Sequence, residues 1–333
     1  MTTTMTAIVA SAGPIGDTAT FREVEVPVPE PRPRDLLVRV EAVSVNPVDT
    51  KRRAGLGAGE SARYGFDAAG TVVAVGDEVT GFALGDEVFY AGDITRDGTD
   101  AEFHAVDERI VGHKPTTLDF AGAAALPLTA ITAWESLFEK LRLGADSTGT
   151  LLVVSGAGGV GSILTQLARQ LTGVTIVATA SRPESREFVA RMGAHHVVDH
   201  SGDLVAAVRE VVPEGVRWIF SPQTAHHFDA YVELLAPFGE LVTIDGARGL
   251  DTTRLVQPSI TWHQEWMFTR AKFETPDMAE QGLLLDAVAA LVDEGRVVST
   301  LTTRLDGFTA ENLRRAHELV ESGRSVGKVV VAR

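Results

Sequence analysis

Three glycines in the middle of the chain have the spacing of a phosphate-binding turn. Gly156, Gly158 and Gly161 form the pattern G-x-G-x-x-G within "LLVVSGAGGVGSILTQLAR" (151–169). The turn directly follows an apolar run and directly precedes a helical pattern, which is the context that this motif requires. Such glycines allow a tight turn and a close backbone approach to a pyrophosphate, and the following helix offers free N–H groups. We therefore predict a bound dinucleotide, with a ligand-free glycine turn as the alternative.

The end of the next expected strand indicates which dinucleotide is bound. Proteins that bind NAD usually carry an acidic residue there to hold the ribose hydroxyls. This chain reads "ATASRPES" (178–185), with Ser181 and Arg182 at that point and no acid before Glu184. A hydroxyl and a guanidinium match a 2′-phosphate, which a carboxylate would repel. The residues predict NADPH; the alternative is that Arg182 is a solvated arginine at the start of a helix.

The overall composition limits the classes of protein to consider. A chain of 333 residues favours two domains. The net charge of −15, without a cluster of Lys and Arg, argues against a nucleic-acid partner. The absence of cysteine excludes disulfides, thiolate nucleophiles and cysteine-bound zinc. No apolar run is long enough to span a membrane and the first residues lack a secretory signal, so we expect a cytoplasmic protein without a membrane partner.

Hydrophobic patterns change in character along the chain. The first part reads as strands, at 37–45, 68–76 and 85–92. From about residue 128, strands expected at 151–155, 174–179, 196–198, 216–220 and 240–245 alternate with helices expected at 160–171, 183–192, 202–211, 226–236 and 279–294. This alternation predicts a doubly wound parallel sheet. We expect a β-rich domain (1–127), a dinucleotide-binding domain (128–296) and a return segment (297–333) that completes the first domain, with an active-site cleft between the domains.

Several stretches in this order resemble a known family. They include "VSVNPVDTKRRAG" (43–55), "GFDAAGTVVAVGDEVTGFALGDEVF" (65–89), "AAALPLTAITAWESL" (123–137) and "AHELVESGRSVGKVVV" (316–331). The chain resembles the zinc-independent medium-chain dehydrogenase/reductases of the NADPH:quinone oxidoreductase type, within a bacterial branch labelled zinc-type alcohol dehydrogenase-like. The resemblance implies an α/β fold, with a GroES-like catalytic domain and a Rossmann domain.

The resemblance also implies that the site holds no metal. Zinc alcohol dehydrogenases of this fold have a cysteine where this chain has Asn46, and a Gly-His-Glu near "GFDAAG", where this chain has Phe66 and Asp67. A catalytic zinc needs about three protein ligands, which Asp67 alone cannot supply. A metal-free site suits hydride transfer to quinones or α,β-unsaturated carbonyl compounds, because these acceptors require only hydrogen bonds at the developing negative oxygen.

The resemblance places particular residues at this site. It puts Asn46 and Thr132 beside the nicotinamide, although Asn46 also suits a simple turn and Thr132 a plain helix position. Lys51, which stands where several relatives have tyrosine, and Tyr64 are further candidates for catalysis. The predicted cofactor-binding residues are Asn46, Thr132, Gly156, Ala157, Gly158, Gly159, Val160, Gly161, Ser181, Arg182, Ile244 and Lys328.

Two other functions remain open at this stage. One is an NADPH-binding sensor or structural protein with little turnover, and the other is a carbonyl or alcohol oxidoreductase. The resemblance further implies a homodimer in which an edge strand pairs between subunits.

Overall fold

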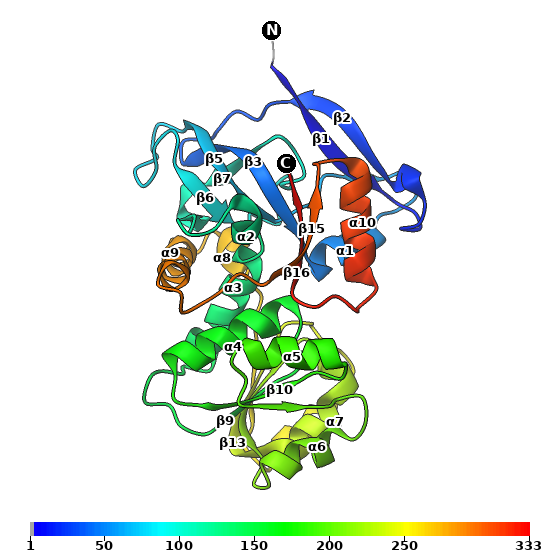
Figure 1. Ribbon diagram of the computed structural model, residues 1–333, viewed down its shortest axis with the longest axis vertical. Helices are drawn as coiled ribbons and strands as arrows, with labels where there is room; N and C mark the ends of the chain where they lie inside the picture. Colours follow the sequence, from blue (N-terminus) through cyan, green and yellow to red (C-terminus); the bar gives the residue numbers. More distant parts are fainter. Residues whose placement is uncertain (1–2) are drawn as a thin grey trace. The chain divides into compact units, whose positions relative to one another are not determined.

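The computed structural model describes residues 3–333, which form two compact units (Figure 1). Unit 1 contains the described residues up to Ile131 together with Phe268–Arg333, and unit 2 is Thr132–Met267. Unit 1 is therefore built from two stretches of chain that are separated in sequence by the whole of unit 2. The divisions fall at 131/132 and 267/268, whereas the sequence indicated 127/128 and 296/297.

Unit 1 is built mainly from antiparallel strands in two sheets. The larger has the order β15-β16-β3-β5-β6-β8, with β7 also paired to β3, and the smaller has the order β2-β1-β4. Among the described strands of this unit, β15 and β16 pair in parallel and the other pairs are antiparallel. The strands are β1 (Thr4–Ser11), β2 (Phe21–Pro27), β3 (Asp35–Val45), β4 (Ser61–Ala62), β5 (Asp67–Val75), β6 (Glu87–Tyr90), β7 (Phe103–Asp107), β8 (Val111–His113), β15 (Leu301–Asp306) and β16 (Lys328–Ala332).

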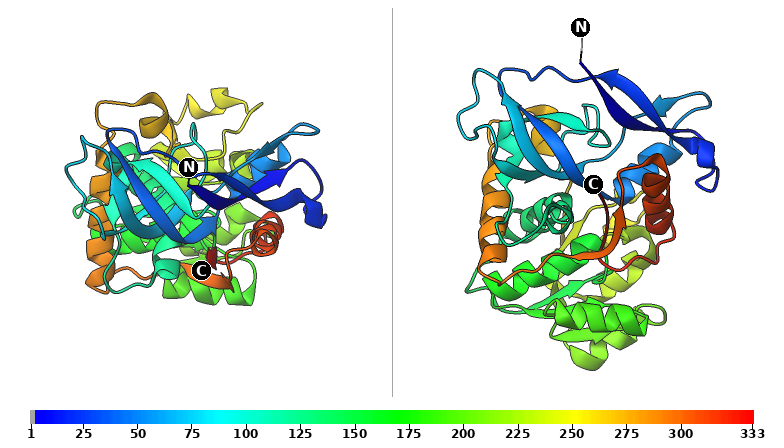
Figure 2. Two further views of the ribbon diagram at one scale, coloured as in Figure 1. Left: turned by 90° about the horizontal axis from the view of Figure 1, so that it is seen from above. Right: turned by 45° about the horizontal axis from the view of Figure 1, so that its top comes forward.

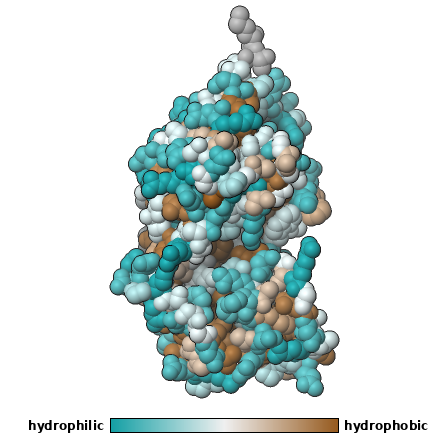
Figure 3. Space-filling view, turned by 90° about the vertical axis from the view of Figure 1, so that its right-hand side faces the viewer, coloured by the Kyte–Doolittle hydropathy of each residue, from teal (hydrophilic) through white to brown (hydrophobic). Residues whose placement is uncertain are grey.

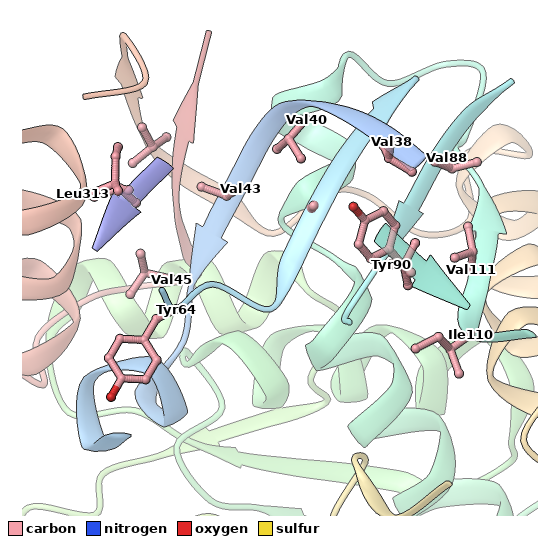
Figure 4. Packing of buried hydrophobic residues seen from close by; sticks show 14 of the residues in the cluster. Val38, Val40, Val43, Val45, Tyr64, Val88, Tyr90, Ile110, Val111 and Leu313 are labelled. Atoms are coloured by element: carbon pink, nitrogen blue, oxygen red, sulfur yellow. The ribbon is translucent and has the colours of Figure 1, made fainter. Parts of the chain in front are cut away.

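The long strand β3 is the centre of this unit because three other strands pair with it. It pairs with β5, β7 and β16, and nearly all of its residues are buried. Valines from β3 pack with residues of β6, β8 and the C-terminal part of the chain (Figure 4). The labelled members of this core are Val38, Val40, Val43, Val45, Tyr64, Val88, Tyr90, Ile110, Val111 and Leu313.

Helices α9 and α10 lie on opposite sides of unit 1, as both views in Figure 2 show. Two glycines let α9 approach β8 closely: a Cβ on Gly112 would lie 2.5 Å from the Leu285 Cβ, and one on Gly282 would lie 2.8 Å from the Val111 oxygen. This packing explains why α9 belongs to unit 1, although its sequence pattern continued the helices of unit 2. The helices of unit 1 are α1 (Pro47–Ala54), α2 (Phe120–Ala124), α8 (Thr269–Phe273), α9 (Glu280–Asp293) and α10 (Ala310–Glu321), with short turns η1 (Thr18–Thr20) and η2 (Glu108–Ile110).

Unit 2 is a six-stranded parallel sheet in the order β11-β10-β9-β12-β13-β14. Its strands are β9 (Thr150–Val153), β10 (Thr175–Thr179), β11 (His196–Val198), β12 (Val216–Ser221), β13 (Leu235–Thr243) and β14 (Thr261–Gln264). Its helices are α4 (Gly159–Leu171), α5 (Pro183–Arg191), α6 (Leu204–Val211) and α7 (Thr224–Leu234), with a short turn η4 (Thr252–Leu255). The predicted doubly wound sheet is confirmed, although β13 begins at Leu235 rather than at residue 240.

The helix that enters unit 2 changes its winding part-way. α3 (Pro127–Trp134) continues directly into a π-helical turn, η3 (Glu135–Lys140). Such turns are rare and occur frequently at functional sites.

The surface shown in Figure 3 is mostly hydrophilic, with small apolar areas between polar ones. Acidic side chains outnumber basic ones by 45 to 30, in accord with such a surface. Within residues 3–333, no helix combines the length and the apolar character needed to cross a membrane.

Candidate active site

Three neighbouring strands of unit 1 bring a lysine, an asparagine and an aspartate to one buried point. The antiparallel pairing of β16 with β3, and of β3 with β5, places Ser44 opposite both Val330 and Asp67. Lys328 begins β16, Asn46 directly follows β3, and Asp67 begins β5. The exposed fractions of Lys328, Asn46 and Asp67 are only 3%, 1% and 0%. We call Ser44, Asn46, Asp67 and Lys328 the Asp67 cluster.

The Asp67 carboxylate receives hydrogen bonds on both of its oxygens. Its Oδ2 lies 3.1 Å from the Lys328 Nζ and accepts bonds from the Ser44 Oγ and the Asn46 Nδ2, both at 2.8 Å. Its Oδ1 accepts the backbone N–H of Leu128 at 2.7 Å. Four donors thus contact this one carboxylate, three at Oδ2 and one at Oδ1. A buried charge needs this degree of pairing, because an uncompensated one is costly.

The Asn46 amide is held at both ends by the same cluster. Its Nδ2 donates to Asp67, and its Oδ1 accepts a hydrogen bond from the Lys328 ammonium. The Lys328 Nζ also donates to the Val45 carbonyl at 3.3 Å, so its three hydrogens have three acceptors. The structure therefore brings together Asn46, which the sequence analysis proposed for both catalysis and cofactor binding, and Lys328, which it proposed for cofactor binding alone.

Asp49 is a buried acid next to the cluster that the sequence reasoning missed. Its Oδ2 accepts the backbone N–H of Asn46 at 2.7 Å, and its Oδ1 accepts that of Gly65 at 3.2 Å. Burial raises the pKa of Asp49 to about 7. An acid three residues after an asparagine is a typical capping pattern at a helix start, so the signal was present in "NPVD".

Tyr64 and Lys51, the other predicted catalytic residues of unit 1, do not join the Asp67 cluster. The Tyr64 hydroxyl donates to the Arg52 carbonyl at 3.1 Å, near the end of α1, and its side chain points toward that helix in Figure 4. Burial raises the pKa of Tyr64 above its ordinary value. Lys51 lies on α1 with an exposed side chain.

The glycine turn of unit 2 has the geometry of a dinucleotide site. A Cβ on Gly156 would lie 2.9 Å from the Ala178 Cβ, and one on Gly161 would lie 2.4 Å from the Ser155 oxygen, so neither position has room for a side chain. Gly158 caps α4 without any side-chain hydrogen bond. The first N–H groups of α4 thus lack a side-chain cap, as a helix N-terminus that binds phosphate requires.

The remaining predicted cofactor residues of unit 2 lie around this turn and the sheet. Ala157 is in the turn, and Gly159 and Val160 begin α4. The Ile244 N–H donates at 3.3 Å to the carbonyl of the last residue of β12, at the carboxyl edge of the sheet. Thr132 lies near the end of α3 and is buried, at 4% exposure.

Ser181 and Arg182 follow the end of β10, and both are partly exposed. Arg182 directly precedes α5, and its Nε lies 3.4 Å from the Glu184 Oε1. About a third of the Arg182 side chain is exposed, at 33%. An ion pair this open is weak, so a phosphate can compete with Glu184 for the guanidinium.

Arg186 is already engaged by the backbone. Its guanidinium donates to the carbonyls of Ala180 and Val197 at 3.3 and 3.0 Å. These bonds connect α5 to the segments at β10 and β11, so the Arg186 guanidinium stabilises the fold at this point.

Two family models match this architecture. The alcohol dehydrogenase GroES-like domain matches residues 32–128, and the zinc-binding dehydrogenase model matches residues 159–280. A zinc-type alcohol dehydrogenase-like protein of Staphylococcus aureus is 40% identical over 303 residues, which cover 89% of this chain and 90% of that protein. The chain belongs to the medium-chain dehydrogenase/reductase superfamily. This membership confirms the expected family, its fold and the expectation of an oxidoreductase.

Other members of the superfamily resemble the chain over nearly its whole length. A solved structure described as a "putative zinc-dependent alcohol dehydrogenase protein" from Rhizobium etli is 49% identical with a TM-score of 0.95, covering 100% of this chain and 99% of that one. An NADPH-dependent alkenal/one oxidoreductase of Arabidopsis thaliana is 30% identical, covering 89% of this chain and 71% of that protein.

The chain differs from zinc-dependent members of the superfamily in its available ligands. No three His, Asp or Glu side chains come together in a group that could hold a metal ion anywhere in residues 3–333. Asn46 and Asp67 bind each other and Lys328, and the ring of Phe66 packs against that of Phe268 with centroids 4.8 Å apart. This donor set does not fit zinc.

Proposed function

We propose that this chain is an NADPH-dependent, metal-free reductase that transfers hydride to quinones or α,β-unsaturated carbonyl compounds. The observation that carries the reaction class is the Asp67 cluster, in which the two residues at the zinc position are held by each other and by Lys328. A conjugated acceptor suits this site, because it needs hydride and hydrogen bonds rather than a Lewis acid. The name of the Arabidopsis relative describes the same class of acceptor.

The cofactor part of the proposal rests on the residues of unit 2. The uncapped start of α4 would hold the pyrophosphate, and Ser181 with Arg182 would hold the 2′-phosphate. When bound, the reduced nicotinamide supplies the hydride. Glu184 lies beyond this pair and stays in contact with solvent, at 70% exposure, so it does not replace the ribose-binding acid of NAD-dependent proteins.

Asn46 contributes to the reaction by keeping the Asp67 cluster closed. Its amide oxygen accepts a hydrogen bond from Lys328, and its amide nitrogen donates one to Asp67. In this proposal the acceptor binds beside the Asp67 cluster, whose side chains are fixed by hydrogen bonds, and Asn46 does not donate a hydrogen bond to it.

A panel of acceptors tests the reaction class. We expect the protein to oxidise NADPH with quinones or enones at rates at least about 100-fold above those with simple ketones, and to oxidise simple alcohols at negligible rates. Absorbance at the nicotinamide band measures each rate. Robust oxidation of secondary alcohols would overturn the proposal, and so would tight NADPH binding without turnover of any acceptor in the panel.

A pair of arginine variants tests the choice of cofactor. Arg182→Ala should weaken NADPH binding roughly 10- to 100-fold, because a charge-assisted contact to phosphate is worth about 1.5–3 kcal/mol. NADH binding should change little. Arg186→Ala is the matched control: its bonds go to the backbone, so it should lower thermal stability without changing the preference. Equal affinities of the unmodified protein for NADPH and NADH would contradict the assignment of Arg182.

A further inference from the structure

Side-chain hydrogen bonds join the segments that leave the carboxyl ends of β12 and β13. These two strands are neighbours in the parallel sheet of unit 2, and they end at Ser221 and Thr243. Helix α7 begins at Thr224, just beyond the end of β12, and Ile244 and Asp245 directly follow the end of β13. Ligands of open parallel sheets bind outside this edge, so contacts made here bear on how a ligand is held.

The start of α7 receives its cap from a distant part of the sequence. The preceding residue, Gln223, caps the helix without a side-chain hydrogen bond. Instead, the Asp245 Oδ2 accepts the backbone N–H of Thr224 and the Asp245 Oδ1 accepts the Thr224 hydroxyl, both at 2.6 Å. The first N–H groups of a helix have no partner inside it, and a carboxylate at this end is also favoured by the helix dipole. We call these two bonds the Asp245 cap.

Buried hydrogen bonds around the Asp245 cap extend it into a network. The Ser221 hydroxyl shares a hydrogen bond with the Tyr231 hydroxyl at 2.7 Å and accepts the N–H of Gln223 at 3.0 Å. The Ile244 N–H donates to the Ser221 carbonyl at 3.3 Å. Ser221 and Tyr231 are completely buried. These bonds hold the end of β12, the start of α7 and the backbone at Ile244 together, and Asp245 is the next residue along that backbone.

The order of the strands places the Asp245 cap on the nicotinamide side of the proposed cofactor site. The start of α4, which follows β9, would hold the pyrophosphate, and Ser181 with Arg182, which follow β10, would hold the 2′-phosphate of the adenosine. In the sheet, β10 lies on one side of β9, whereas β12 and then β13 lie on the other. A dinucleotide that extends from β10 across β9 therefore brings its nicotinamide half to the ends of β12 and β13.

We propose that Asp245 is a positioning residue for hydride transfer, because its cap on α7 holds the backbone of Ile244 against one face of the nicotinamide. The inference rests on the proposed function. Asp245 itself touches neither the cofactor nor the acceptor. Its role is to keep one face of the ring covered by protein, so that hydride leaves from the other face alone.

A positioning role predicts an effect on rate rather than on affinity. In the proposed site, charge-assisted contacts to phosphate at α4 and Arg182 supply most of the NADPH affinity, and the Asp245 cap makes none of them. A misplacement of about 1 Å at the reacting atoms can lower a rate about 100-fold. Loosening the cap should therefore lower kcat while NADPH still binds. A general loss of folding would instead reduce the amount of active protein and leave the choice of face unchanged.

The central variants are Asp245→Ala, which removes both bonds of the cap, and Asp245→Asn, which can restore them. An asparagine oxygen can accept the Thr224 N–H while its amide nitrogen donates to the Thr224 hydroxyl. With NADPH and the best quinone or enone, Asp245→Ala should lower kcat about 10- to 100-fold with little change in NADPH affinity. Asp245→Asn should retain most of the rate. Thr224→Val removes one of the two bonds, should lower kcat less, and decides the question if Asp245→Ala folds poorly.

The matched control is Asp203→Ala. Asp203 caps α6 in the same unit, where its Oδ1 accepts the Ala206 N–H at 3.0 Å. This helix follows β11, which is the edge strand on the other side of the sheet. Asp203→Ala should lower thermal stability, as the loss of a helix cap does, and should retain the kcat of the unmodified protein.

NADPH labelled with deuterium on one face of C4 gives a readout that stability alone does not move. The unmodified protein and Asp203→Ala should transfer hydrogen from one face only, whereas Asp245→Ala should transfer it from both. An Asp245→Ala variant with unchanged kcat and single-face transfer would overturn the positioning role, as would an equal loss of kcat in Asp203→Ala. An unmodified protein that binds NADPH but reduces no quinone or enone would instead refute the proposed function.

Discussion

Two regions of this protein bury a carboxyl group, and they differ in the groups that surround it. In unit 1, Asp67 faces an ammonium group and three further donors, so both oxygens of the buried carboxylate are hydrogen-bonded. In unit 2, the buried Glu265 carboxyl group is near that of Glu135, and its Oε1 receives no hydrogen bond within residues 3–333. In the first arrangement, the hydrogen bonds of Asp67 fix the side chains of Ser44, Asn46 and Lys328. In the second, burial raises the pKa of Glu265 above its ordinary value.

The largest expected effect on stability comes from removing the Lys328 ammonium group from the Asp67 cluster. Lys328→Met should destabilise the protein by about 3–5 kcal/mol, because it leaves the Asp67 carboxylate buried without its counter-charge. Combining it with Asp67→Asn should recover a substantial part of that loss, since the double variant has no buried charge at this point. Urea unfolding of the two single variants and the double variant measures the coupling. Additive losses would mean that Lys328 and Asp67 do not act as a pair.

Asp49 is an intermediate case that sharpens the comparison, because its carboxyl group has only backbone donors. Its pKa is raised from 3.8 to about 7 in the folded protein. Between these values the folded state binds more protons than the unfolded state, so the contribution of Asp49 to stability falls as the pH rises. Relative to Asp49→Asn, the unmodified protein should lose up to about 1.4 kcal/mol per pH unit across this window. Unfolding free energies of both proteins at several pH values check this, and a difference that is independent of pH would contradict it.

The smallest effect on stability should come from Glu265. Glu265→Gln should cost little stability, because the neutral amide avoids the cost of burying a carboxylate at this position. The folded-state pKa of Glu265 is raised, so its contribution to stability is lost as the pH rises above the ordinary carboxyl range. The variant should therefore become more stable than the unmodified protein at alkaline pH. Thermal unfolding above neutral pH measures the difference, and a loss as large as that of Lys328→Met would place Glu265 in the same class as Asp67.

Local patterns were sufficient to predict most of unit 2, although not strand β14 or the continuous helix α3–η3. The glycine turn lies between β9 and α4 as its sequence context required, and the helices predicted within 128–296 end within about two residues of those observed. These features depend on residues close together in sequence, where periodicity and turn chemistry act directly. The position of α9 is different, because a helical pattern does not specify which sheet the helix covers.

The contacts within the Asp67 cluster could not be predicted from the sequence, because they depend on strand pairing between distant parts of the chain. Asn46 was identified as a site residue, yet its amide is fixed by Lys328, which reaches it only through the pairing of β16 with β3. Glu135 and Glu265 were missed because each reads as an ordinary surface acid. Glu265 directly precedes the apolar residues "WMF". This neighbourhood is a weak indication that its carboxyl group is buried.

The split of unit 1 around unit 2 has a consequence for how the protein is made. When the ribosome has completed Thr132–Met267, that contiguous stretch has all of its strands and can fold, as domains generally do during synthesis. Unit 1 at that moment still lacks β15 and β16. Asp67 cannot pair with Lys328 until β16 has been synthesised. The order of synthesis therefore allows unit 2 to fold before unit 1 is complete. A nascent chain stalled before β16 would present a carboxylate without its ammonium partner, and chaperones or proteases could distinguish it from the finished protein.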